Sequence, residues 1–146
     1  MGIFPDSYAR NTITNAITTT TTITPKLLKE YAIDFDTGEI AIDDNGKFTI
    51  VEGIEAVKVR NWLALQIQRN RYIIYPSNFG NELKTLIGKG ISYINKNIQK
   101  LLEDALLDGI YVTSLKDISV TPNEDKVTIT FTIDTIYGSY TDSKIY

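Results

Sequence analysis

The chain has 146 residues with a formal net charge of −3, and it contains neither cysteine nor histidine. One domain of this length can bury a core without disulfides, and the missing residue types exclude Ser-His-Asp and Cys-His catalytic centres and zinc sites built on thiolate or imidazole. The acidic balance argues against nucleic acid as a partner, and no apolar run approaches the roughly 20 residues of a membrane-spanning helix. Since the glycine-rich motifs that cradle phosphates are missing as well, we expect no cofactor, no metal and no membrane association.

The N-terminal segment differs in composition from the rest of the chain. Residues 11–24, NTITNAITTTTTIT, are rich in threonine, and their isoleucines are too widely spaced to form a compact apolar face. We expect residues 1–24 to form an extended arm and residues 25–146 to form one folded domain. The arm is either a frayed terminus or a segment that pairs with a partner on assembly, and the sequence does not separate these two interpretations.

Residues 31–51 alternate apolar and polar positions around two turn sequences, Thr37-Gly38 and Asp43-Asp44-Asn45-Gly46. Alternation between glycine-containing turns predicts a small β-meander. The acidic residues near the first turn also resemble the start of an EF-hand loop. However, the glycine spacing and the distal glutamate of that motif are missing, so we expect no calcium site.

Three helices are predicted next. Apolar residues, Trp62 among them, recur at helical spacing over residues 53–69 in a stripe wide enough for a largely buried helix. A short helix should cover residues 81–87 and end at the glycines of Gly88-Lys89-Gly90. Residues 91–107 have the clearest helical period in the chain, with apolar residues on one face and charged residues away from it.

Strands are predicted after these helices. Residues 110–120 are rich in β-branched and aromatic types, residues 121–125 form a turn, and residues 127–133 alternate strictly between apolar residues and threonine. The tail, residues 136–146, carries three tyrosines, which is more aromatic area than a dangling end needs. The predicted fold class is therefore α+β, a single domain with a mostly antiparallel sheet packed against two or three helices.

Among the catalytic mechanisms considered, the composition leaves only the two-carboxylate chemistry of glycosidases. Glu52 and Glu55 are the candidate pair, because such an enzyme needs one protonated and one ionised carboxyl group. Both residues stand at the start of the predicted helix 53–69, where acidic side chains are favourable against the helix dipole. The helix position accounts for both residues more simply, so we expect no catalytic residue.

The connector between the first two predicted helices, RNRYIIYPSNFGNEL, is unusually rich in groups that bind proteins. Its arginines and aromatic residues are Arg69, Arg71, Tyr72, Tyr75 and Phe79, types that are over-represented at interface hot spots. Two alternative roles stay open. In the first, the arginines complement a helix C-terminus, and Tyr72, Ile74 and Phe79 pack under the loop. In the second, the connector stacks single-stranded nucleic acid. The acidic remainder of the chain disfavours nucleic acid.

Four stretches in order carry a family resemblance: YAIDFDTGEI, VEGIEAVKVRNWLALQIQRNRYIIYPSNFGNELKTLIGKG, IQKLLEDALLDGIYVTSL and VTITFTIDTIYG. Together they make residues 30–138 similar to the sheath initiators of contractile phage tails. This family includes the XkdS-like proteins of PBSX-type prophages and baseplate wedge proteins sometimes labelled lysozyme-like. The resemblance implies a structural protein of the virion tail baseplate, assembled in the cytoplasm of a bacterial host and present in several copies around the tail axis.

The resemblance also implies partners. The protein would dock on baseplate wedge proteins and present strands to the tail sheath protein, with tail tube and hub proteins as further candidates. In that family a Glu–Arg pair in the connector anchors the protein to the wedge. Here the arginine is Arg69 or Arg71, and the glutamate is not matched, because Gln68 or Asn70 stands in its place.

For the sheath, we expect an edge strand that a sheath strand can extend. The residues of this expected edge strand are Val127, Thr128, Ile129, Thr130, Phe131, Thr132 and Ile133. Residues 138–146 should become ordered only in the assembled baseplate. The alternative function that the old label suggests is a lysozyme-like cell-wall glycosidase.

Overall fold

The computed structural model describes residues 24–146, so the predicted N-terminal arm lies almost entirely outside the described residues. The described chain is a mixed α+β domain, which confirms the predicted fold class. Two helices, one 3₁₀ helix and five strands make up this part of the chain, in the order β1 (Lys29–Tyr31), β2 (Ile50–Glu52), α2 (Ile54–Gln66), η1 (Leu83–Leu86), α3 (Ile91–Leu106), β3 (Val112–Asn123), β4 (Lys126–Thr135) and β5 (Gly138–Ile145).

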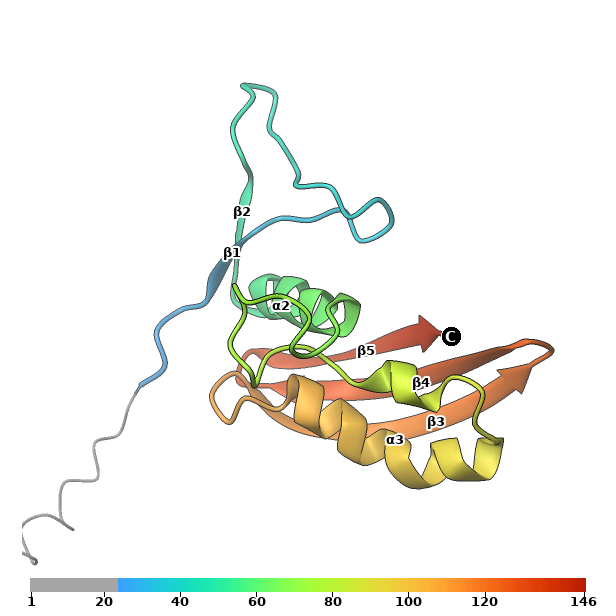
Figure 1. Cartoon of the computed structure of the whole chain (residues 1–146). Helices are drawn as coiled ribbons and strands as arrows, with labels where there is room; N and C mark the ends of the chain where they lie inside the picture. Colours follow the sequence, from blue (N-terminus) through green and yellow to red (C-terminus); the bar gives the residue numbers. More distant parts are fainter. Residues whose placement is uncertain (1–23) are drawn as a thin grey trace, which may run out of the picture.

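The C-terminal half forms a three-stranded antiparallel sheet in the order β3-β4-β5, and α2 and α3 pack over one of its faces (Figure 1). On β4, Ile129, Phe131 and Ile133 are at most 2% exposed and reach the core under the helices. The threonines between them lie on the opposite face and are half-buried. The predicted alternation of this strand is therefore confirmed, because side chains point to opposite faces with a period of two.

The expected position of this strand at a sheet edge is wrong. β4 pairs with β3 on one side and with β5 along its whole length on the other, from Thr128 opposite Ile145 to Thr135 opposite Gly138. The prediction that residues 138–146 order only on assembly is wrong for the same reason, since β5 is a strand of the isolated chain. Its backbone pairing with β4 does not need a strongly apolar sequence.

The predicted helices are found with adjusted limits. In α3, Ile94, Ile98, Leu102 and Leu106 are buried along the predicted apolar face. The short helix is a 3₁₀ helix of four residues rather than an α-helix. β3 runs through most of the predicted turn at residues 121–125, because the β3–β4 hairpin turns more tightly, around Glu124 with its φ of 49°.

The predicted meander is confirmed as well. β1 pairs with β2, and single bridges join Ile33 to Ile40 and Ile42 to Phe48, so that three extended segments meet pairwise. The turns form where they were predicted, with Asp34 and Asp43 accepting hydrogen bonds from the backbone N–H groups that follow them. Figure 1 shows that the meander extends away from the helices and the sheet.

Candidate interaction surfaces

The connector between α2 and η1 is a closed loop whose two ends are tied together. Gln68 and Asn81 form a bridge, and the Asn81 backbone exchanges hydrogen bonds with Ile67 and Arg69 at 2.9 Å each. The buried Asn81 amide also donates to the carbonyl oxygens of Ala64, Leu65 and Ile67 at 2.8–3.0 Å, which satisfies the C-terminal end of α2. These contacts end the helix at Gln66, earlier than predicted.

Position 80, beside the bridge between Gln68 and Asn81, requires a glycine. Its φ of 98° lies in the region that favours glycine, and an added Cβ would lie 2.8 Å from the carbonyl oxygen of Ile67. The loop is therefore held in one conformation at its base, and its tip is presented on a fixed support.

Arg69 points inward from this loop. Its guanidinium donates to the carbonyl oxygens of Asp104, at 2.6 Å, and Gly80, at 3.2 Å, and lies 3.4 Å from the Glu82 carboxylate. Asp104 belongs to the last turn of α3, where carbonyl groups lack helical partners. Arg69 thus joins the connector to α3 and acts as a positioning residue, which favours Arg71 in the choice between the two arginines.

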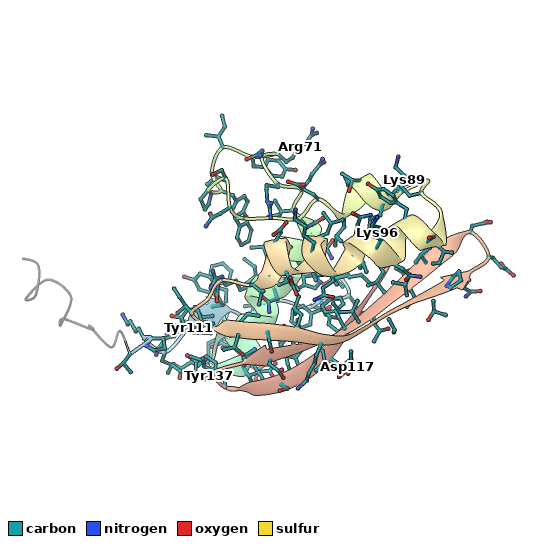
Figure 2. The ribbon with its side chains drawn as sticks, turned by 90° about the horizontal axis from the view of Figure 1, so that it is seen from below. Arg71, Lys89, Lys96, Tyr111, Asp117 and Tyr137 are labelled. Atoms are coloured by element: carbon teal, nitrogen blue, oxygen red, sulfur yellow. The ribbon has the colours of Figure 1, made fainter. Side chains whose placement is uncertain are left out.

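The exposed tip of the connector consists of Arg71, Tyr72, Ile73 and Ile74. Arg71 projects from the loop on the helix side of the molecule (Figure 2). Tyr72 is 56% exposed, and Ile73 and Ile74 are 105% and 85% exposed. The predicted interface set omitted the two isoleucines, although two adjacent β-branched apolar residues in a polar loop were the available signal. The alternative in which Tyr72 and Ile74 pack under the loop is wrong, because both are exposed.

The last two predicted connector residues, Tyr75 and Phe79, are half-buried and stack with ring centroids 4.9 Å apart. Phe79 also packs against the main core. The structure therefore divides the predicted set: Arg69, Tyr75 and Phe79 build the loop, whereas Arg71 and Tyr72 are available to a partner.

The three-stranded sheet has two unpaired edges among the described residues, one on β3 and one on β5. The β3 edge is irregular, because its register shifts twice and Asp117, within the second shift, has a φ of 53°. Asp117 lies on the side of the sheet away from the helices (Figure 2). Bulges and charged residues are typical protections of an edge, so β3 is poorly suited to further pairing.

The β5 edge is regular. Its pairing with β4 shows no shift, and Tyr146 exchanges backbone hydrogen bonds with Val127 at 2.8 and 3.0 Å. Because hydrogen-bonded pairs alternate along an antiparallel ladder, residues 138, 140, 142, 144 and 146 face β4 with their backbone groups. The backbone groups of residues 139, 141, 143 and 145 therefore point toward the open edge.

A groove of about 410 Å³ runs beside this edge, between β5 and α2. Trp62 and Phe35 line it with their rings 5.9 Å apart, and Lys58 lies 5.6 Å from the ring centre of Tyr140. The buried Asn61 amide donates a hydrogen bond to the Tyr140 hydroxyl oxygen at 2.8 Å, and burial raises the pKa of Tyr140 to about 12. The sequence does not reveal this groove, because Trp62 also fits the apolar stripe of α2 and could equally be a core residue.

Both glutamates of the candidate acid pair form ion pairs on the surface. Glu52 pairs with Lys29, and Glu55 lies 2.6 Å from Lys58, with about half of each carboxylate side chain exposed. Glycosidase acids need a pocket that favours the protonated form, and neither glutamate is buried in one. In the described part of the chain, no three His, Cys, Asp or Glu side chains group to hold a metal ion. Over residues 24–146, no helix is both long enough and apolar enough to cross a membrane.

Comparison with known proteins identifies a family. The chain is 29% identical over 112 residues to the phage-like element PBSX protein XkdS of Bacillus subtilis strain 168, which covers 75% of both chains. Residues 29–138 match the model of a family described as the contractile injection system sheath initiator. This match spans the meander, both helices, β3 and β4, and the chain belongs to the contractile injection system sheath initiator family.

Proposed function

We propose that this protein docks on the baseplate wedge of a contractile tail through its connector tip and starts the sheath through the open edge of β5. Membership of the sheath initiator family establishes a structural role connected with the sheath. The finer proposal includes a place in the virion tail baseplate, assembly in the host cytoplasm and several copies around the tail axis, near tube and hub proteins. It also includes the absence of catalytic activity.

The observation that carries the sheath contact is the regular β5 edge beside an aromatic groove. An added strand would bond its backbone to residues 139, 141, 143 and 145, while alternate side chains enter the groove at Trp62 and Phe35. The predicted residues of β4 then act indirectly. They hold β5 in place from the centre of the sheet, and their own backbone groups are already paired.

A proline in β5 tests this contact. Thr141→Pro removes a backbone N–H that points toward the open edge, so the domain should stay folded while sheath assembly fails and bare tubes form. Thr141→Ser keeps the N–H and should assemble normally. Asp142→Pro removes an N–H that faces β4 and should lower stability. Full sheaths in electron micrographs of tails carrying folded Thr141→Pro would refute the β5 edge as the template.

A second pair of variants tests the wedge contact. Arg71→Ala with Ile73→Ser removes exposed groups, so the domain should keep its stability, while binding to purified wedge proteins should weaken by about 2 kcal/mol or more. Arg69→Ala is the matched comparison, because it should act through lost stability of the connector. Unchanged wedge binding by the folded double variant would remove the connector tip from the proposal.

A further inference from the structure

The meander has an apolar face that nothing in the described chain covers. Its register puts Tyr31 opposite Ile50, Ile33 opposite Ile40 and Ile42 opposite Phe48 on one side of the three segments. Most members of this meander face are 45–59% exposed, namely Tyr31, Ile40, Ile42, Phe48 and Ile50. A contiguous apolar surface of this kind marks an interaction site.

The segment that forms the meander is strongly acidic. Residues 29–52 contain two lysines and seven acidic residues, a net charge of −5, whereas the whole chain carries −3. The occupant of this surface should therefore combine apolar side chains with positive charge.

The same chain carries a surface of that chemistry on α3. Residues 84–100 contain four basic residues and no acidic residue, a net charge of +4. Tyr93, Lys96 and Lys100 follow one another at helical spacing on α3, and Lys89, just before the helix, lies 5.6 Å from the Tyr93 ring centre. These four residues form the α3 face. Ile87, nearby in the chain, is 64% exposed, and Tyr93 is 48% exposed. Lys89 and Lys96 project on the helix side of the molecule (Figure 2). The acidic Glu103 and Asp104 lie toward the opposite end of the helix.

We propose that the meander face of one copy docks on the α3 face of a second copy. The meander and α3 lie at opposite ends of the molecule (Figure 1), so the two faces can meet only between copies. A contact between two different surfaces is heterologous, and its repetition gives a ring or an open chain of subunits. This contact is independent of the sheath and wedge contacts, and the isolated protein tests it.

The meander face is small, so the contact is weak in solution and gains strength where copies are held around a common axis. Sedimentation velocity of the full-length chain over a concentration series should show self-association at low salt. The concentration at half-association should rise by about tenfold or more in 0.5 M salt, roughly as screening of exposed charges requires.

Charge reversal on each surface provides the specific test. Asp36→Lys with Asp44→Lys changes meander carboxylates that make no hydrogen bond or ion pair with other described residues, and Lys89→Glu with Lys96→Glu changes the α3 face. Each double variant should raise the half-association concentration by about tenfold or more. Asp125→Lys, in the distant β3–β4 turn, is the control and should have little effect.

The fourfold variant, with all four charge reversals, distinguishes a specific contact between the two faces from a general effect of net charge on self-association. It carries both reversals, so its surfaces are complementary again and self-association should return. Circular dichroism should show all variants folded, because the changed residues are exposed. A wild-type chain that stays monomeric at every concentration in low salt would overturn the proposal, and so would a folded fourfold variant that fails to associate.

Discussion

β4 and the meander have the same alternating sequence pattern and opposite environments. In β4 the apolar members Ile129, Phe131 and Ile133 are almost fully buried beneath α2 and α3. In the meander the apolar members lie on one face and remain about half exposed, as Ile42 and Phe48 show at 59% and 57%. Alternation therefore predicts a strand with one apolar and one polar face, but it does not indicate what covers the apolar face.

Strand length explains part of this difference. β4 has ten residues between two long neighbours, whereas β1 and β2 have three residues each. Two short strands and single bridges bury too little surface to be stable alone. The meander is supported by Trp62 of α2, whose ring lies next to Phe35. The same ring lies 3.5 Å from the place where a Cβ added to Gly38 would stand. Its apolar face remains about half exposed.

The largest expected effect contrasts two phenylalanines. Phe131→Ala removes a side chain with no exposure at the centre of the core and should lower the free energy of unfolding by about 3–5 kcal/mol. Phe48→Ala removes a ring that is 57% exposed and lies edge-on to Tyr31, and the change should stay below about 1 kcal/mol. Urea unfolding followed by circular dichroism measures both. Equal losses would mean that the meander belongs to the same cooperative core.

The next effect contrasts two asparagines of the connector. Asn81→Ala removes three hydrogen bonds to the end of α2 and the one that its side chain accepts from the Leu83 N–H, which should cost about 2–3 kcal/mol. Asn78→Ala, on the exposed part of the loop, should change stability by less than about 0.5 kcal/mol. The same urea titration measures both variants. An Asn81→Ala variant with unchanged stability would show that the loop closes without this amide.

Elements with a strong period were predictable from the sequence. α3 and β4 were predicted, because each is a regular element with one buried face, and the spacing of its apolar residues indicates that face. β5 was not predicted, since GSYTDSKI is mostly polar and its pairing comes from the tight turn after Thr135 and from the backbone of β4. Without β5, the central place of β4 could not be known, and its threonine face suggested an open edge.

The connector shows the same limit at the level of single residues. Composition marked it as an interface, but Arg69 and Arg71 are equivalent in sequence. Their roles separate only because Arg69 meets the carbonyl oxygens of Gly80 and Asp104, residues brought near by folding. Long-range contacts of this kind leave no local pattern.

A pH prediction compares two aspartates with the same turn chemistry. Burial raises the pKa of Asp108, but hydrogen bonds from the N–H groups of Val112, Ile110 and Tyr111, with the nearby Arg60 guanidinium, outweigh it and lower the pKa overall. Asp34 in the meander has a lowered pKa through hydrogen bonds from Thr37 and Asp36 and is fully exposed. A lowered folded pKa means that the contribution is complete above the unfolded value and is lost as the pH falls through the folded one.

Asp108→Asn should therefore lower the free energy of unfolding at neutral pH by about 1 kcal/mol after allowance for solvent screening. It should also flatten the fall in stability below about pH 4, the ordinary range of aspartate. Asp34→Asn should leave the global acid transition nearly as in the wild type, because its turn lies outside the core. Urea titrations between neutral and acidic pH measure the difference. Parallel curves for Asp108→Asn and the wild type would contradict the assignment.

The smallest expected effect on folding is at Ile42. Ile42→Ser keeps the single bridge to Phe48, which is made by the backbone, and removes an apolar side chain that is 59% exposed. The free energy of unfolding should change by less than about 0.5 kcal/mol, whereas Ile129→Ser, the same substitution at a residue only 2% exposed on β4, should destabilise strongly. Sedimentation of Ile42→Ser should nevertheless show weaker self-association than the wild type, because the lost side chain belongs to the meander face. A folded Ile42→Ser variant that associates like the wild type would show that the exposed apolar residues of the meander serve a different contact.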